Sequence, residues 1–459
     1  MTTTAGPPDA PTDAPSPAPS PTPSVSPTPP ATPGLWAQLR PLVLRLHFCA
    51  GLLVASLTGL AYVFSPQLSD VVHGDQLLAP DPGAPPRPLD EQVAAAVAAL
   101  PEGTLSGVAV PVDPTRTTAV TFDVAGLADG VQRTVYVDPA SARVLGTLDT
   151  WFGYPPLRST LDNLHRHLLL GEPGRIYSEM AASWLPVLVV GGLALWIGRH
   201  RARRRDLLLP PVPARPGRAR IRGWHAVTAL WLTVGLAFLS VTGLTWSTYA
   251  GERFQAVVTA LDGSTPGLSV ETVPVPPGTA PIGVGEVVDR AREAGLVDRL
   301  AVSVPAAADA PYTVAEDADG LPVQRDEVAI DPYTGAVVET VRWDDYPVLA
   351  QLTSLGISAH MGLLFGLANQ LLLAALAVGL LCVLFWGYRM AWLRRPTRTG
   401  ARLAAPAPRG TIRALSQPAA FAVVLVAVAA GWLMPVFGLS LLAFVLVDAA
   451  LGALAHRRT

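Results

Sequence analysis

Long apolar segments most constrain the fold of this chain, because only a lipid bilayer or a large buried core can accommodate them. Four such segments lie at residues 41–64, 181–198, 224–246 and 362–386. About 20 apolar residues are enough for a helix to cross about 30 Å of hydrocarbon. Half of the 459 residues are hydrophobic and only 15% are charged, well below the share of about 25% that is usual in soluble domains. The sequence therefore predicts a multi-pass α-helical membrane protein in contact with the lipid bilayer.

A fifth apolar run covers residues 419–452 and is interrupted at Met434-Pro435. Proline in the interior of a helix removes a hydrogen bond and kinks or breaks the helix. We expect a tight hairpin of two short helices here, and one long kinked helix is the alternative. With the hairpin, the chain has about six transmembrane helices.

Arginine clusters set the expected orientation in the membrane. They follow the second apolar segment at 199–222, follow the fourth at 389–398, and end the chain at Arg457-Arg458. Positively charged loops next to membrane spans are typically cytoplasmic. The protein is therefore expected in the cell (inner) membrane, with both termini in the cytoplasm and residues 65–180 and 248–361 outside.

The two outer segments share a pattern. Arg133–Gly146 and Asp326–Glu339 each contain two runs of alternating β-branched residues around an Asp-Pro pair, which predicts an antiparallel hairpin with a turn of about six residues. Ala/Val-rich helical stretches precede them at Glu91–Leu100 and Gly285–Ala294. We expect two small extracytoplasmic α+β domains, each with one helix and a small antiparallel sheet.

The repeat extends beyond the hairpins into the apolar segments. The matching pairs are Trp151–Pro155 with Trp343–Pro347, His165–Gly171 with His360–Gly366, and Leu57–Leu60 with Val241–Leu244. A unit of helix, outer domain, histidine and returning helix therefore occurs twice.

These patterns divide the chain into ten parts. They are a disordered Pro-rich cytoplasmic tail (1–34), the first transmembrane helix (41–64), the first outer domain (65–160), an interfacial helix with the second transmembrane helix (161–198), an Arg-rich cytoplasmic loop (199–222), the third transmembrane helix (223–247), the second outer domain (248–350), an interfacial segment with the fourth transmembrane helix (351–388), a cytoplasmic loop (389–418) and the final hairpin (419–452).

Four histidines stand at matched positions in the two repeats. His47 and His225 lie near the inner ends of the first and third spans, and His165 and His360 lie at the outer boundary before the second and fourth. An ionisable residue at membrane depth is costly, and a neutral imidazole is a good axial ligand for haem iron. The pattern predicts two bis-histidine b-type haems, one near each face, with these four residues as iron ligands. Ordinary interfacial histidines are the alternative.

Residues near the outer pair refine this prediction. His167 competes with His165, but on a helix the two side chains point roughly 200° apart, and the alignment with His360 favours His165. Arg166 and Arg175 lie outside, against the positive-inside trend. Because arginine forms bidentate pairs with carboxylates, we expect them to bind haem propionates.

A glycine on the third span gives weaker support for haem binding than the histidines do. Gly243 follows His225 by 18 residues, or about five helical turns, which places both on one helix face. Glycine there would let a porphyrin approach the backbone, and ordinary small-residue helix packing is the alternative.

The residues resemble those of the PepSY-associated transmembrane family over about residues 40–452. The resemblance rests on the Leu-His-Phe and Leu-Thr-Gly-Leu segments (46–48 and 57–60), the Leu-His-Arg-His-Leu-Leu-Leu-Gly-Glu-Pro-Gly segment (164–174) and the paired Asp-Pro hairpins. That family includes iron-regulated membrane proteins and inner-membrane siderophore reductases. The resemblance implies PepSY-like outer domains and an oxidoreductase that reduces a ferric siderophore or another external electron acceptor during iron uptake.

Together, these observations predict a transmembrane electron conduit with two haems b. Electrons would enter at His47 and His225 and leave from His165 and His360, and we expect no catalytic residue besides these ligands and no nucleic-acid partner. The chain has no dinucleotide-binding or Walker A motif, so the donor is expected to be quinol or a separate cytoplasmic reductase. One alternative is a non-enzymatic membrane binding or regulatory protein of the protease-inhibitor or chaperone type. Another is a transporter built on repeats.

Overall fold

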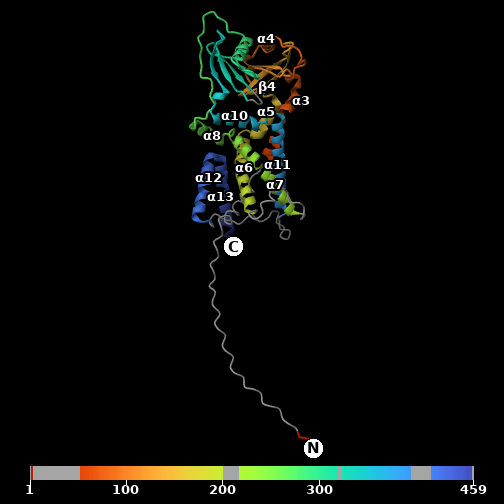
Figure 1. Cartoon of the computed structure of the whole chain (residues 1–459), viewed down its shortest axis with the longest axis vertical. Helices are drawn as coiled ribbons and strands as arrows, with labels where there is room; N and C mark the ends of the chain where they lie inside the picture. The colour runs from red at the N-terminus through yellow and green to blue at the C-terminus, as the bar shows by residue number, and fades with distance from the viewer. Residues whose placement is uncertain (1, 4–51, 200–216, 318–322, 394–414, 457–459) are drawn as a thin grey trace.

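The computed structural model describes residues 2–3, 52–199, 217–317, 323–393 and 415–456. A β-sheet occupies one end of the molecule and a bundle of long helices lies below it (Figure 1). His47 lies outside the described residues, so its role stays a prediction.

Within the described residues, four helices are long and apolar enough to cross a membrane. They are α6 (Glu172–Arg199), α7 (Arg218–Leu244), α11 (Leu367–Trp392) and α13 (Pro435–His456). Two shorter apolar helices accompany them, α2 (Leu53–Val63) and α12 (Gln417–Leu433). The chain is therefore a membrane protein with a multi-pass helical region. Helix α2 is the described part of the first apolar segment.

The last apolar run contains two helices that break at Met434. Pro435 begins α13, a position where its missing N–H costs nothing. A β-carbon built on Gly431 would lie 3.1 Å from the Cα of Gly438, so the two glycines let α12 and α13 pack side by side (Figure 1). The indole N–H of Trp184 on α6 donates to Ser440 at 2.9 Å, which fastens this hairpin to the bundle.

In the part of the chain that the structure describes, eight strands form one antiparallel sheet with the order β4-β3-β2-β1-β5-β6-β7-β8. The strands are β1 (Thr104–Val110), β2 (Thr118–Asp123), β3 (Val131–Val137), β4 (Val144–Trp151), β5 (Leu300–Ser303), β6 (Tyr312–Glu316), β7 (Glu327–Ile330) and β8 (Val337–Val341). Each repeat supplies four consecutive strands, and the halves join where β1 pairs with β5. The outer segments therefore form halves of one sheet, in contrast to the two separate domains expected over 65–160 and 248–350.

The two halves also share one hydrophobic core. Helices α4 (Leu89–Ala99) and α9 (Val284–Glu293) pack on the sheet, where the expected helical stretches lie. Ala96 on α4 and Val287 on α9 are fully buried in one cluster with Phe122 and Ile330 from the sheet. Residues from both repeats thus bury one another, and this mutual burial holds the halves together.

The Asp-Pro hairpin turns have matching hydrogen bonds. In the first, the Asp138 N–H donates to the Arg143 carbonyl at 2.9 Å, and the carboxylate accepts from Ser141. In the second, the Asp331 N–H likewise donates to the Ala336 carbonyl at 2.9 Å, and the carboxylate accepts from the backbone N–H of Tyr333 at 2.7 Å. Both turns occupy the six residues between their strands, as the sequence predicts.

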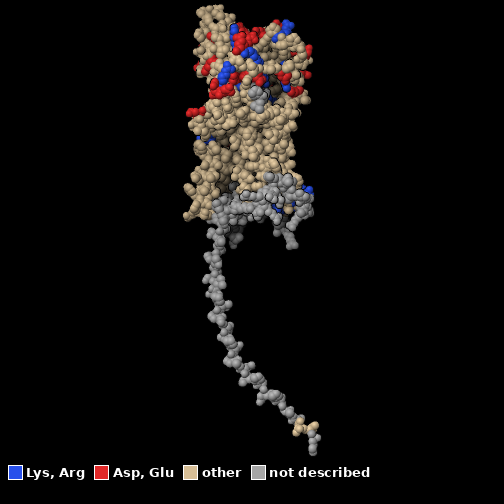
Figure 2. All heavy atoms as spheres, viewed as in Figure 1, with Lys and Arg blue, Asp and Glu red and all other residues tan. Residues whose placement is uncertain are grey.

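Short helices connect the sheet to the bundle. They are α3 (Ser65–Leu77), α5 (Pro156–His167), α8 (Tyr249–Ala260) and α10 (Val348–His360), with a 3-10 turn at Trp343–Asp345. Charged side chains gather over the sheet, whereas the surface of the bundle below is almost free of them on the face shown in Figure 2. This separation fits an apolar belt in lipid beneath a polar domain in water.

Candidate functional site

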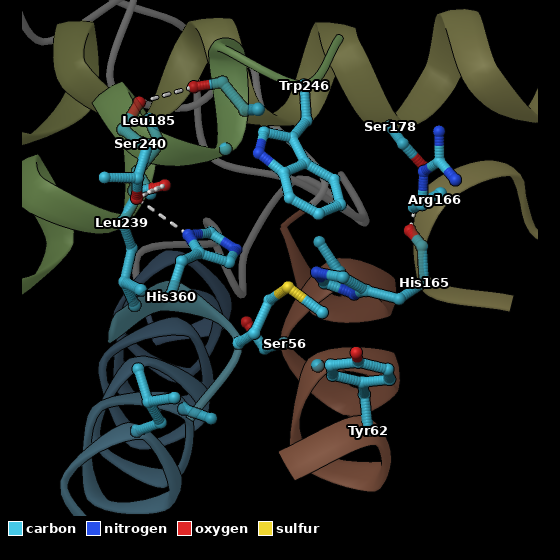
Figure 3. A pocket seen from close by; sticks show the side chains of 18 of the residues that line it. Ser56, Tyr62, His165, Arg166, Ser178, Leu185, Leu239, Ser240, Trp246 and His360 are labelled. Atoms are coloured by element: carbon cyan, nitrogen blue, oxygen red, sulfur yellow. Dashed lines mark hydrogen bonds between the residues drawn. The ribbon is translucent and has the colours of Figure 1, made fainter. Parts of the chain in front are cut away.

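A cavity of about 240 Å³ lies among the helices of the bundle. We call it the bundle cavity. Its walls come from α2, α5, α6, α7, α10 and α11, so both repeats contribute. Most of the lining surface is apolar, and His165 and His360 project into the cavity with Trp246 and Tyr62 nearby (Figure 3).

The first repeat holds His165 against helix α2. The Nδ1 of His165 lies 3.0 Å from the hydroxyl oxygen of Thr58. Glycine follows this threonine, and a β-carbon on Gly59 would lie only 3.1 Å from Cε1 of the same ring. The Thr-Gly pair therefore supplies both a polar partner for the imidazole and the space that the ring occupies.

The second repeat holds His360 in the same way against helix α7. Its Nδ1 lies 2.7 Å from the hydroxyl oxygen of Thr242, and a β-carbon on Gly243 would lie 3.3 Å from Cε1. Among the residues that the structure describes, no hydrogen bond reaches Nε2 of either His165 or His360. The two rings thus have one nitrogen held and one open toward a common space.

The structure separates His165 from its competitor. His167 does not line the bundle cavity, and its Nε2 lies 2.9 Å from the side-chain oxygen of Asn163 on its own helix. Of these two histidines, only His165 shares the cavity with His360.

Arg166 and Arg175 both line the bundle cavity. Arg166 donates to Asp162 at 3.3 Å and its guanidinium lies 5.6 Å from the ring centre of Trp151. Arg175 donates to the Thr248 hydroxyl at 2.9 Å. Each side chain is partly exposed, so both can reach an anionic group at the outer edge of the cavity.

His225 lies at the opposite end of α7 from Gly243 and outside the bundle cavity. Its Nδ1 donates to the backbone carbonyl of Val383 on α11 at 2.9 Å. A β-carbon on Gly387 would lie 3.7 Å from its ring. His225 therefore resembles the outer histidines in having Nδ1 held and a glycine of the facing helix beside its ring.

The donor set of the bundle cavity fits a haem better than a bare metal ion. Within the described part of the chain, no three His, Cys, Asp or Glu residues converge on one point, as a protein-only metal site requires. A haem brings four nitrogens of its own and takes axial imidazoles from the protein. Two open Nε2 atoms, a mostly apolar lining surface and two arginines in the lining match that requirement.

Sequence reasoning missed the role of the threonines. For Gly243 it left two roles open, room for a porphyrin and ordinary helix packing, and the structure places this glycine against His360. The signal was present in the repeated Thr-Gly pairs. What the sequence lacked was any indication that Thr58 meets a residue 107 positions away.

The fold and the cavity define a multi-pass membrane protein with an antiparallel sheet at one end that two repeats share. Residues 42–395 match the family described as the PepSY-associated TM region. This match covers more than three quarters of the 459 residues, so the chain belongs to that family, which confirms the resemblance found in the sequence. No curated protein matches the chain.

Proposed function

We propose that this protein is a haem b electron carrier that passes electrons across the membrane to an acceptor on the sheet side. His165 and His360 would hold one haem in the bundle cavity, and His225 with His47 would hold a second near the other face. The observation that carries the proposal is the pair of repeat-related imidazoles with open Nε2 atoms in one cavity.

A bound haem iron takes up and releases single electrons, and the residues of the chain supply its surroundings. The apolar lining would keep water away from a bound haem, and electrostatic interactions are stronger where the local dielectric constant is low. Arg166 and Arg175 would bind the propionates at the outer edge through charge-assisted hydrogen bonds. The hydrogen bonds with Thr58 and Thr242 would hold the two imidazoles in place as ligands of that haem.

The orientation follows from charge. Arg218, Arg220 and Arg222 begin α7 at the end of the bundle opposite the sheet, and this end is assigned to the cytoplasm by the positive-inside rule. Both termini are then cytoplasmic in the inner membrane. The donor would be quinol or a cytoplasmic reductase, and the acceptor a ferric siderophore, whose iron binds hard oxygen ligands less tightly after reduction to Fe(II).

The test is the absorbance of the purified full-length chain in detergent, oxidised and dithionite-reduced, with a pyridine haemochrome count. We expect b-type bands and two haems per chain. His360→Ala and His225→Ala should each lose one haem. His167→Ala is the matched control, because His167 lies on the same helix as His165 but outside the cavity, and this variant should keep both haems.

Two results would contradict the proposal. One is a colourless protein after expression with ample haem, which would favour the non-enzymatic binding role. The other is full haem content in His360→Ala and His225→Ala alike. If the haems are present, stopped-flow reoxidation by a ferric siderophore then tests the acceptor separately from the cofactor.

A further inference from the structure

The proton positions on the outer histidines can be read from the threonines that contact them. A threonine hydroxyl has one hydrogen and can donate only once. The Thr242 hydroxyl lies 2.8 Å from the Phe238 carbonyl, and that carbonyl can only accept. The hydroxyl hydrogen therefore goes to Phe238, and the hydroxyl oxygen accepts from the ring. Nδ1 of His360 must then carry the hydrogen.

The same reasoning applies independently in the first repeat. The Thr58 hydroxyl donates to the Val54 carbonyl at 2.9 Å, so its oxygen accepts from Nδ1 of His165 at 3.0 Å. A neutral imidazole carries one hydrogen. With that hydrogen on Nδ1, Nε2 of each ring keeps its lone pair and is ready to bind a metal.

We propose that Thr58 and Thr242 are positioning residues that fix the Nδ1–H form of His165 and His360 and so make Nε2 the iron ligand. The inference rests on the proposed haem site. The glycine after each threonine belongs to the same arrangement, because a β-carbon there would meet the ring at 3.1 or 3.3 Å and push it away from the hydroxyl. Partners that orient a ligating histidine commonly raise its basicity and affect metal affinity by about 10–100-fold.

The inner histidine, His225, has a different kind of hydrogen-bond partner at its Nδ1. Nδ1 of His225 faces the Val383 carbonyl, which can only accept, so that ring also carries its hydrogen on Nδ1. The outer rings depend on a side chain for this hydrogen, whereas the inner ring depends on the backbone. A substitution can therefore remove the partner at the outer site alone.

The experiment compares Thr242→Val with Thr242→Ser and with Thr233→Val. Thr233 is the matched control, because it lies on the same helix and its hydroxyl makes the same bond to the carbonyl four residues back, to Ala229 at 2.9 Å. Nitrogen-15 NMR of histidine in haem-free full-length protein reports which ring nitrogen carries hydrogen. Haem titration and redox potentiometry of the loaded protein report ligand strength.

We expect the wild type, Thr242→Ser and Thr233→Val to keep His360 in the Nδ1–H form. Thr242→Val should mix in the Nε2–H form, weaken haem binding by about tenfold and raise the reduction potential of one haem, because a less basic ligand stabilises ferric iron less. Thr58→Val should do the same through His165. If Thr242→Val and Thr58→Val left the tautomers, affinity and potentials unchanged, the inference would be overturned. A wild-type protein that binds no haem would overturn the proposed function. The NMR comparison of the haem-free proteins would still show whether the threonine sets which ring nitrogen carries the hydrogen.

Discussion

Three glycines beside the histidine rings provide a graded test of the packing. Alanine at Gly59, Gly243 or Gly387 would place a β-carbon 3.1, 3.3 or 3.7 Å from the nearest ring carbon. Carbon atoms attract best at about 3.5–4.0 Å. The His165 ring must therefore retreat by about 0.5 Å in Gly59→Ala, the His360 ring by a smaller distance, and the His225 ring need not move.

The energies follow the same order. Overpacking costs about 1–3 kcal/mol, and replacing glycine by alanine inside a helix returns about 1 kcal/mol through backbone entropy. Gly59→Ala should therefore lose up to about 2 kcal/mol of stability. Gly243→Ala should lose less, and Gly387→Ala should gain up to about 1 kcal/mol.

The assay is the thermal unfolding midpoint of the full-length chain in one detergent, with haem content measured on the same samples. We expect the midpoints to rise from Gly59→Ala through Gly243→Ala to Gly387→Ala, with the last at or above the wild type. Gly59→Ala should also bind less haem, since retreat of the ring stretches its bond to Thr58. A Gly387→Ala protein as unstable as Gly59→Ala, or a Gly59→Ala protein more stable than the wild type, would refute this reasoning.

Three further changes test other parts of the structure. Trp184→Phe removes the hydrogen bond to Ser440 that links α6 with α13 and should lower the unfolding free energy by about 1 kcal/mol. Thermal unfolding measures this loss. Adding Ser440→Ala to Trp184→Phe should cause no further loss, because the hydrogen bond is already absent. Burial raises the pKa of Glu327 on β7, so the stability that its protonated form provides is present at acidic pH and is lost as pH rises through the raised pKa. Glu327→Gln should therefore raise the unfolding midpoint at neutral pH and leave it unchanged near pH 4. An equal shift at both pH values would contradict burial as the cause. Asp331→Ala removes the acceptor of two backbone N–H groups in the second hairpin turn and should cost about 1–2 kcal/mol, visible as faster hydrogen exchange in β7 and β8 than in β3 and β4.

The long apolar helices and the family could be predicted from the sequence because their signals are local. Length and composition identify α6, α7 and α11, and Pro435 marks the break before α13. The matched histidines and Thr-Gly pairs were visible because the repeat aligns them.

The contacts between distant segments could not be predicted in this way. Hydrogen bonds of the β1·β5 junction connect backbone groups from different repeats, and backbone pairing leaves no mark on residue type. The Thr58–His165 contact joins two side chains, and its partners could not be paired from the sequence either. A repeated Thr-Gly pattern indicates that something is required twice, but only the packed helices show that the partner is the histidine of the same repeat.

The β1·β5 junction has the register of a two-fold axis. When Val110-Pro111 is aligned with Val304-Pro305 in the sequence, Val108 and Val302 are equivalent, and these two residues face each other, with their neighbours exchanged on either side. Two identical chains would meet in this isologous way in a homodimer, and a half chain alone would leave the edge of β1 open to aggregation.

Fusion of the two halves has a consequence that identical subunits cannot achieve. In a homodimer every substitution appears twice around the axis, whereas in a single chain each half can diverge alone. The bundle cavity already shows such divergence, because the residue after the histidine is Arg166 in one half and Met361 in the other, and both line the cavity. A molecule bound in the cavity therefore meets a paired arginine and aspartate from one half and a thioether from the other, so its two opposite orientations are no longer equivalent.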